Sequence, residues 1–156
     1  MKQTPIYDEI QRQMAPGVIT LDGFLGPDTR KLVDIIAADE KLVHYANTTN
    51  QAIAERMEHF RDLGLKGLGE FISVGPHFDV KVDTIRGRLP SPFGGQGMYD
   101  KVNTTVVNKR LDKTIIYTDL HIHLIKDHGF FQGVGSRYRL EPFDLIKILE
   151  LVPSKV

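Results

Sequence analysis

A chain of 156 residues is long enough to bury a hydrophobic core without disulfides or a structural metal ion. It contains no cysteine, which excludes disulfide frameworks, cysteine-ligated zinc, iron–sulfur clusters and thiol catalysis. Its 20 lysine and arginine residues balance 20 aspartate and glutamate residues, so the net charge argues against a protein dedicated to binding nucleic acid or a membrane surface.

The first 19 residues lack the apolar core of a signal peptide, and no apolar run approaches the roughly 20 residues that cross a bilayer. With the missing cysteines, this predicts a soluble, cytoplasmic protein without a membrane partner. No repeat or long linker divides the sequence. We expect an N-terminal extension over residues 1–18, carrying a short helix from about Thr4 to Met14, and a single domain over residues 19–156.

Two amphipathic helices are expected next. The first spans about Arg30 to His44, and the second about Asn50 to Leu63, with Thr48 or Thr49 as its N-cap and Gly64 as its stop.

The hydrophobic period then changes to two. Four strands are expected, over Phe71–Val74, 78–82, Lys101–Asn108 and Thr114–Tyr117, with a loop rich in proline and glycine, 89–97, between the second and third. A final helix follows Pro142. Helices, then strands, then helices predict an α+β fold with a mostly antiparallel sheet of about four strands covered by helices.

Three of the six histidines lie in the segment Thr118–His128, which fits either a strand or a helix. As a strand, it would place Asp119, His121 and His123 on one face, an arrangement that metal sites use. As a helix, it is capped by its first residue, ends at Gly129 and separates an apolar face from a polar one. This separation favours the helix.

In the helical interpretation, His121 and His128 lie on the buried face and His123 on the exposed face. The two buried histidines are about 10 Å apart along the axis, too far to share a metal ion easily. Asp119, His123 and Asp127 are then best interpreted as a solvated face, so we predict no metal site and no cofactor. His121 and His128 are interpreted as core histidines, and a catalytic role remains open for His128 or His123.

The segment Gly129–Arg139 combines glycines with arginines. Glycines let consecutive N–H groups face one point, and arginines offer paired donors, so this loop is suited to hold a phosphate or carboxylate. A second basic segment lies beside the turn Pro90–Gly95. Neither segment matches a P-loop or a dinucleotide fingerprint, and an ordinary surface connection is the alternative for both. The candidate ligand-binding residues are Ser136, Arg137, Arg139 and Arg86.

A resemblance to a known group rests on short motifs between Gly23 and Leu149. They include Phe24-Leu25-Gly26, Arg86-Gly87, Thr118-Asp119-Leu120, His128-Gly129-Phe130-Phe131 and Arg139-Leu140-Glu141-Pro142. In these motifs the chain resembles a family of uncharacterised bacterial proteins described as hypothetical cytosolic proteins. The resemblance implies a cytosolic location and a compact fold, and it implies no particular activity.

Three functional hypotheses follow. The favoured one is a module that binds a small anionic ligand, or an acidic partner segment, through the site rich in histidine, arginine and glycine. The second is an enzyme with His128 or His123 as general base and Asp127 or Asp119 orienting the imidazole. No motif for a serine nucleophile accompanies it.

The third hypothesis is weak nucleic-acid binding. The segment Thr49–Met57 follows a helix and a short turn, as in helix-turn-helix domains. The acidic balance of this helical pair argues against specific nucleic-acid recognition. The sequence leaves a homo-oligomer open.

Overall fold

The computed structural model of the protein describes residues 2–95 and 97–151. Over these residues it contains five α-helices and a four-stranded antiparallel sheet, which confirms the predicted α+β class. The helices are α1 (Pro5–Gln13), α2 (Leu32–Tyr45), α3 (Asn50–Gly64), α4 (Asp119–His128) and α5 (Pro142–Ile148). The strands are β1 (Ile72–Val74), β2 (Phe78–Pro90), β3 (Met98–Asn108) and β4 (Lys113–Thr118). A short 3₁₀ turn, η1 (Leu65–Gly67), follows α3.

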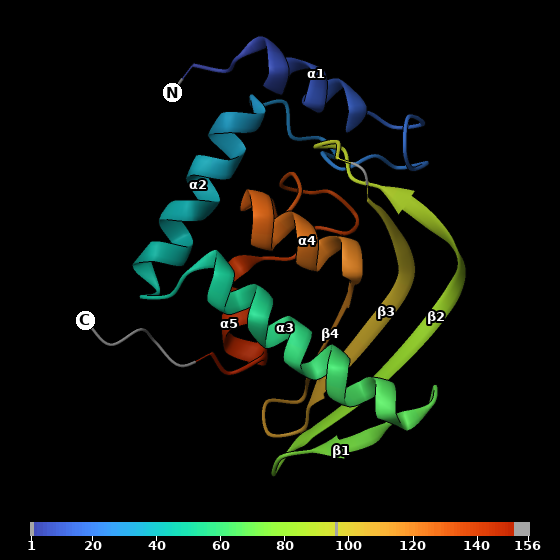
Figure 1. Ribbon diagram of the computed structural model, residues 1–156. Helices are drawn as coiled ribbons and strands as arrows, with labels where there is room; N and C mark the ends of the chain where they lie inside the picture. The colour runs from blue at the N-terminus through green and yellow to red at the C-terminus, as the bar shows by residue number, and fades with distance from the viewer. Residues whose placement is uncertain (1, 96, 152–156) are drawn as a thin grey trace.

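The helices lie on one side of the curved sheet, whose strand order is β1-β2-β3-β4 (Figure 1). Along β2, Phe78, Val80 and Val82 are buried and alternate with less buried polar residues. This alternation gives the sheet one apolar face, which packs against α3 and α4. No helix in the described parts of the chain is long and apolar enough to span a bilayer.

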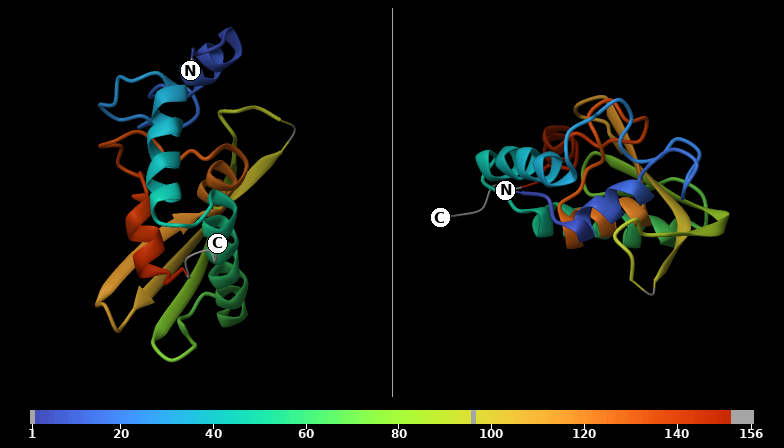
Figure 2. Two further views of the ribbon diagram at one scale, coloured as in Figure 1. Left: turned by 90° about the vertical axis from the view of Figure 1, so that its left-hand side faces the viewer. Right: turned by 90° about the horizontal axis from the view of Figure 1, so that it is seen from above.

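The β2–β3 ladder is longer than the sequence patterns predict. It pairs Phe78 with Asn108 at one end and Pro90 with Met98 at the other, with a bulge between Ile85 and Arg88. β1 and β4 cover only the first part of this ladder. The second part therefore extends beyond the sheet as a two-stranded ribbon, and its end lies beside α1 (Figure 2).

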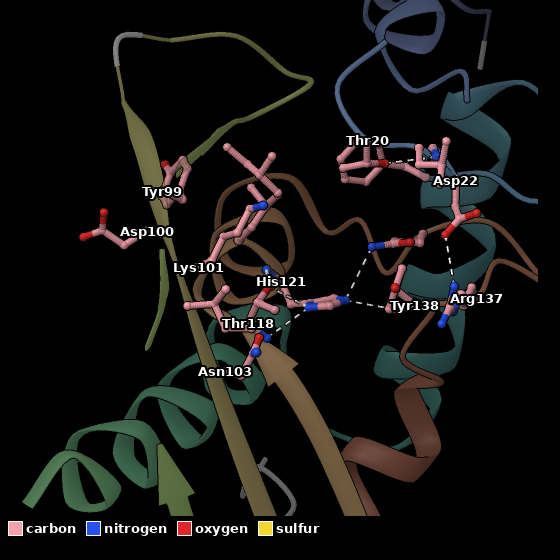
Figure 3. Close-up of a pocket in the computed structure, with 17 residues that line it drawn as sticks. Thr20, Asp22, Tyr99, Asp100, Lys101, Asn103, Thr118, His121, Arg137 and Tyr138 are labelled. Atoms are coloured by element: carbon pink, nitrogen blue, oxygen red, sulfur yellow. Dashed lines mark hydrogen bonds and ion pairs between the residues drawn. The ribbon is translucent and has the colours of Figure 1, made fainter. Parts of the chain in front are cut away.

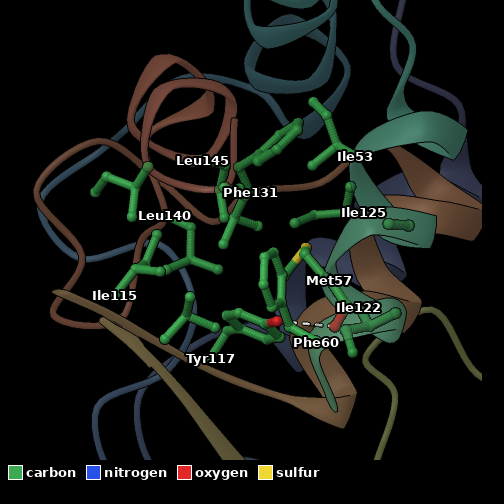
Figure 4. Close-up of a cluster of buried hydrophobic side chains, with 14 of the residues drawn as sticks. Ile53, Met57, Phe60, Ile115, Tyr117, Ile122, Ile125, Phe131, Leu140 and Leu145 are labelled. Atoms are coloured by element: carbon green, nitrogen blue, oxygen red, sulfur yellow. Dashed lines mark hydrogen bonds between the residues drawn. The ribbon is translucent and has the colours of Figure 1, made fainter. Parts of the chain in front are cut away.

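The main core fills the space between the sheet and the helices α3, α4 and α5 (Figure 4). Phe60, Ile125 and Phe131 are fully buried there. Tyr117 is also buried, and its hydroxyl donates to the carbonyl of Met57 at 2.8 Å, so its one polar atom is satisfied. A second buried cluster joins α1, α2 and α4.

The histidine-containing segment is a helix, as favoured from the sequence. The Thr118 side chain accepts from the backbone N–H of His121, and the imidazole of His121 accepts from the backbone N–H of Thr118. Gly129 ends the helix in the left-handed conformation, with φ of 62°. The alternative with Asp119, His121 and His123 on one face of a strand is thereby excluded.

The N-terminal extension folds onto α2. The side chains of Gln11 and Gln3 accept from the backbone N–H groups of Leu32 and Val33 at 3.0 and 3.1 Å. Met14, at the end of the extension's helix, is fully buried in the second cluster. The extension therefore supplies both hydrogen bonds and core surface to the rest of the molecule.

Candidate functional site

A cavity of about 460 Å³ opens where four segments meet (Figure 3). These are the loop around residues 20–24, the ribbon formed by β2 and β3, the start of α4, and the loop 132–138. Its apolar lining includes Leu21, Phe24, Ile85, Leu89 and Leu120. A concave apolar surface with a few polar groups is the usual form of a small-molecule site.

The charged side chains of the cavity differ in how they are paired. Asp100 accepts from Arg88 at 2.9 Å, and Asp22 lies 3.5 Å from Arg137. Lys101 also lines the cavity and forms no ion pair with any other described residue. Arg88, which lies outside the lining, and Arg137 pair with the two aspartates, so Lys101 is left as a charged lining residue without an ion-pair partner among the described residues.

His121 lies at the base of the cavity and is fully engaged in structural hydrogen bonds. Its Nδ1 accepts from the backbone N–H of Thr118, so the proton of the neutral ring is on Nε2, which donates to the carbonyl of Tyr138 at 2.8 Å. Burial lowers the pKa of this imidazole, which keeps it neutral. His121 therefore has the role of a core histidine.

Arg139 does not reach the cavity. Its side chain is only 4% exposed and pairs with both carboxylate oxygens of Asp39 at 2.8 Å. It also donates to Glu141 at 2.7 and 3.2 Å and to the carbonyl of Gln132 at 2.7 Å. Burial alone would lower the pKa of Arg139, but these ion pairs outweigh it and raise the pKa. All five N–H groups are used, so none remains for a ligand.

The glycines of the segment 129–139 serve close packing. A Cβ on Gly133 would collide with the carbonyl of Leu25, and the Gly133 N–H donates to the carbonyl of Phe24 at 2.9 Å. The Ser136 hydroxyl donates to the side chain of Gln132 at 3.0 Å. Gly133 thus joins this loop to the segment before α2, and its N–H is not available to a phosphate.

The remaining candidate arginines are both exposed. Arg137 is 71% exposed and lines the cavity beside Tyr138. Arg86 lies in the bulge of β2 and is not among the residues that line the cavity, although its neighbour Ile85 is. Of the four predicted ligand-binding residues, only Arg137 contributes to the cavity.

His123 was expected on the exposed face of α4, and this expectation is wrong. Its side chain is only 13% exposed, because the ribbon and the loop after β2 fold over this face of the helix. Tyr99 of β3 stacks on the ring at 4.5 Å, and its hydroxyl lies 2.8 Å from Nδ1. Asp119, expected on the same exposed face, pairs with Arg61 at 3.2 Å.

The imidazole of His123 connects a serine to an aspartate. Its Nε2 lies 3.2 Å from the Oγ of Ser91, and its Nδ1 lies 2.7 Å from the carboxylate of Asp127. Ser91 Oγ accepts from the N–H of Phe93, so the hydroxyl proton is free to point at Nε2. With the ring proton on Nδ1, facing Asp127, these contacts would have the arrangement of a Ser-His-Asp triad. The Tyr99 hydroxyl lies at the same nitrogen, and if it donates to Nδ1 the ring proton is on Nε2 and points at Ser91 instead.

The sequence did not single out Ser91, because it lacks the glycine-flanked motif of a nucleophilic serine and follows Pro90. Two residues after Ser91, Phe93 packs on the same helix, α4. The ring of Phe93 stacks on His128 at 3.9 Å, with an angle of 4° between the planes. Burial and the neighbouring His123 lower the pKa of His128, whose ring lies 5.2 Å away.

In the described parts of the chain, no three histidine or acidic side chains converge as a metal site requires. Comparison with protein-family models, with curated proteins and with solved structures finds no match. The candidate function therefore depends on the geometry of the cavity and of the histidine cluster alone.

Proposed function

We propose that this protein binds a small amphiphilic anion in the cavity between the β2–β3 ribbon and the loop 132–138. The observation that carries the proposal is an apolar cavity whose lining includes Lys101, a cation without an ion-pair partner among the described residues. A ligand's apolar body would displace water from Leu89, Phe24 and Leu120, and its carboxylate or phosphate would pair with Lys101 at the edge. Arg137, held only by a 3.5 Å contact with Asp22, is a second partner for the anion.

Only part of the anion site inferred from the sequence takes part in this binding. Arg139 and Ser136 are committed to internal hydrogen bonds, whereas Arg137 faces the cavity. An acidic partner segment would use the same two cations, and a glutamate-rich peptide added to the titration below would reveal it.

The test compares octanoate with octanol, which share an apolar chain and differ in charge. Isothermal titration should show that octanoate binds more tightly. Lys101→Met keeps the apolar stem and should weaken octanoate binding by about tenfold, a loss of about 1.4 kcal/mol, while leaving octanol unchanged.

Lys66→Met serves as the matched control, because Lys66 is exposed in η1, outside the cavity. It should bind both ligands like the parent protein. Equal affinity for octanoate in all three proteins would contradict the role of Lys101. Absence of heat with either ligand would contradict the proposal as a whole.

A second candidate function is ester hydrolysis by Ser91, His123 and Asp127. In this reaction Ser91 Oγ attacks the ester carbonyl and passes its proton to His123 Nε2. The departing alcohol takes that proton, and water then hydrolyses the acyl-serine bond. The geometry favours His123 over His128 as the base, because only His123 has both a hydroxyl and a carboxylate at hydrogen-bonding distance.

This candidate ranks second for a structural reason. Pro92 follows the serine and has no N–H to stabilise an oxyanion. The N–H groups of Phe93 and Gly94 donate to the hydroxyl and the carbonyl of Ser91 itself. The contacts of Ser91 with His123 are equally consistent with a structural role, in which they hold the loop after β2 against α4.

Covalent labelling with a fluorophosphonate tests the hydrolase directly. If Ser91 is a nucleophile, the parent protein and Ser136→Ala should be labelled and should hydrolyse p-nitrophenyl acetate, whereas Ser91→Ala should do neither. Circular dichroism checks that Ser91→Ala is folded. An unlabelled parent protein would exclude the nucleophilic role and leave the structural one.

The exposed face of α3 argues against nucleic-acid recognition. Ile53, Ala54 and Met57 are buried, so Gln51 and Glu55 face solvent in the first turns. A helix that reads nucleic acid needs positive charge toward the phosphates, and this face has none.

A further inference from the structure

The outer edge of β2 is open over most of its length. β1 pairs only with residues 78–80 of β2, whereas β3 pairs with the opposite edge as far as Pro90. Over residues 82–90, no backbone group from the described parts of the chain bonds to the outer edge. Figure 1 shows this edge as the outer margin of the molecule beyond β1. Residues 84–88 are all exposed, so the edge is accessible to another molecule.

The backbone groups of this edge define what can pair with it. An open strand edge presents both N–H donors and C=O acceptors. Another extended backbone matches both kinds of group, which is how a peptide adds a strand to a sheet. The phosphates of a nucleic acid only accept hydrogen bonds, so they would leave the β2 carbonyls without a donor. The edge therefore fits a peptide.

The regular part of the edge is short. The bulge after Ile85 interrupts the β2 strand, and Pro90, at its end, has no N–H. Residues 82–85, before the bulge, keep the regular pairing with β3. Ile85 is 51% exposed, so it offers an apolar side chain to a neighbouring strand. A peptide segment of a few extended residues is enough to cover this part.

The charges beside the regular edge are basic. Between Thr84 and Pro90 the sequence has Arg86 and Arg88 and no acidic residue. Arg88 pairs with Asp100 of β3 at 2.9 Å. Arg86 is exposed, takes part in no ion pair within the described residues, and has no partner residue in β3 because it lies in the bulge. An acidic side chain next to the added strand would give Arg86 a partner.

The same charges argue against a second copy of this chain as the added strand. If residues 82–85 paired with themselves in antiparallel order, Lys81 of each copy would lie opposite Arg86 of the other. Like charges directly opposite one another destabilise a strand pair. An acidic segment is therefore a better match for this edge than the edge itself.

We propose that the open edge of β2 binds an extended acidic peptide segment of a partner protein, which adds a strand to the sheet. The backbone of the segment pairs with residues 82–85, and one of its apolar side chains packs on Ile85. An acidic side chain of the segment pairs with Arg86. This surface is separate from the Ser91 cluster and does not depend on the anion proposed for the cavity.

The test is titration of the isotopically labelled full chain with a peptide of alternating valine and threonine that ends in a run of glutamates, followed by amide NMR. This peptide should shift the amide signals of residues 82–86 and slow their hydrogen exchange. A peptide with lysines in place of the glutamates should bind about tenfold more weakly. Equal affinity of the two peptides would contradict the role of charge. Unchanged signals of residues 82–86 with the glutamate peptide would overturn the proposal.

The backbone pairing has a criterion of its own, because only alternate N–H groups of an added strand face β2. Two versions of the glutamate peptide are N-methylated, one at the even and one at the odd positions of its valine–threonine part. Only the version whose methyl groups face β2 should lose binding. Equal affinity of the two versions would show that side chains alone hold the peptide, which would contradict strand addition.

Arg86→Glu tests the charge from the side of the protein. It should weaken binding of the glutamate peptide by about tenfold and strengthen binding of the lysine peptide. Lys113→Glu is the matched control, since Lys113 is exposed at the start of β4, on the other edge of the sheet. It should bind the glutamate peptide like the parent protein, and so should Arg137→Met.

Two outcomes would assign the peptide or the edge differently. If Arg137→Met weakens binding and Arg86→Glu does not, the peptide occupies the cavity and the proposal is wrong. Analytical ultracentrifugation of the peptide-free protein should show a monomer. A dimer that keeps the peptide away from residues 82–86 would assign the edge to a second copy and overturn the proposal.

Discussion

Three histidines within eight positions of one helix have three different environments. His121 is a neutral hydrogen-bonding residue at the helix start, His123 links a serine to an aspartate, and His128 is a flat surface for the ring of Phe93. Their helical positions explain His121, which faces the core. They do not explain His123, whose partners come from a distant loop.

These environments predict a loss of stability in mild acid. Burial lowers the pKa of His121 and of His128 below the ordinary value near 6.5. As pH falls through about 6.5, the unfolded chain therefore takes up protons that the folded protein does not. The free energy of unfolding should be constant above about pH 7.5 and should decrease as pH falls below about 6.5.

Urea denaturation at about pH 7.5 and 5.5 measures this effect. His128→Phe retains a ring for Phe93 to stack on and removes one titrating group, so the decrease should be smaller. His59→Gln, at an exposed position of α3, is the control and should behave like the parent protein. Equal stability of the parent at the two pH values would contradict the linkage.

The sequence predicted the type of these helices and strands, but it predicted their ends only where the chain supplies a local cap or stop. α4 begins and ends as predicted because Thr118 and Gly129 supply its cap and its stop locally. α2 starts at Leu32, two residues later than predicted, and Lys31 offers no side-chain cap. Its first N–H groups are instead satisfied by glutamines of the N-terminal segment, a contact with no local signal.

β2 shows the same dependence on tertiary contacts. Its alternating apolar pattern ends at Val82, but the strand continues to Pro90 because β3 pairs with it on both sides of the bulge. Arg86 and Gly87 are accommodated by a bulge, which bends the ribbon. Lys101, which lines the cavity, and Tyr99, which stacks on His123, both lie on β3 beside this bulge.

At the scale of the whole molecule, Arg139 connects α2 to the loop that follows α4. Its partner Asp39 lies 100 positions away and is only 3% exposed. Arg139→Met should reduce the free energy of unfolding by about 3–5 kcal/mol, because it leaves a carboxylate buried without a counterion. Urea denaturation measures the change.

Arg137→Met is the control, since Arg137 is exposed and its change should be within about 0.5 kcal/mol. Adding Asp39→Leu to Arg139→Met should restore part of the lost stability, because the unpaired charge is removed. Arg139→Met as stable as the parent would mean that the ion pair does not hold the two segments together.

The sequence by itself determined the α+β class, the helical segment at the histidines and the structural interpretation of His121. Each depends on periodicity and on caps within a few residues, and such signals are intrinsic to a short stretch of chain. Only the tertiary structure decided that Arg139 is buried in an ion pair and that Ser91 meets His123, 32 positions away. These contacts arise when distant segments pack together, and no local pattern specifies which side chains then become neighbours.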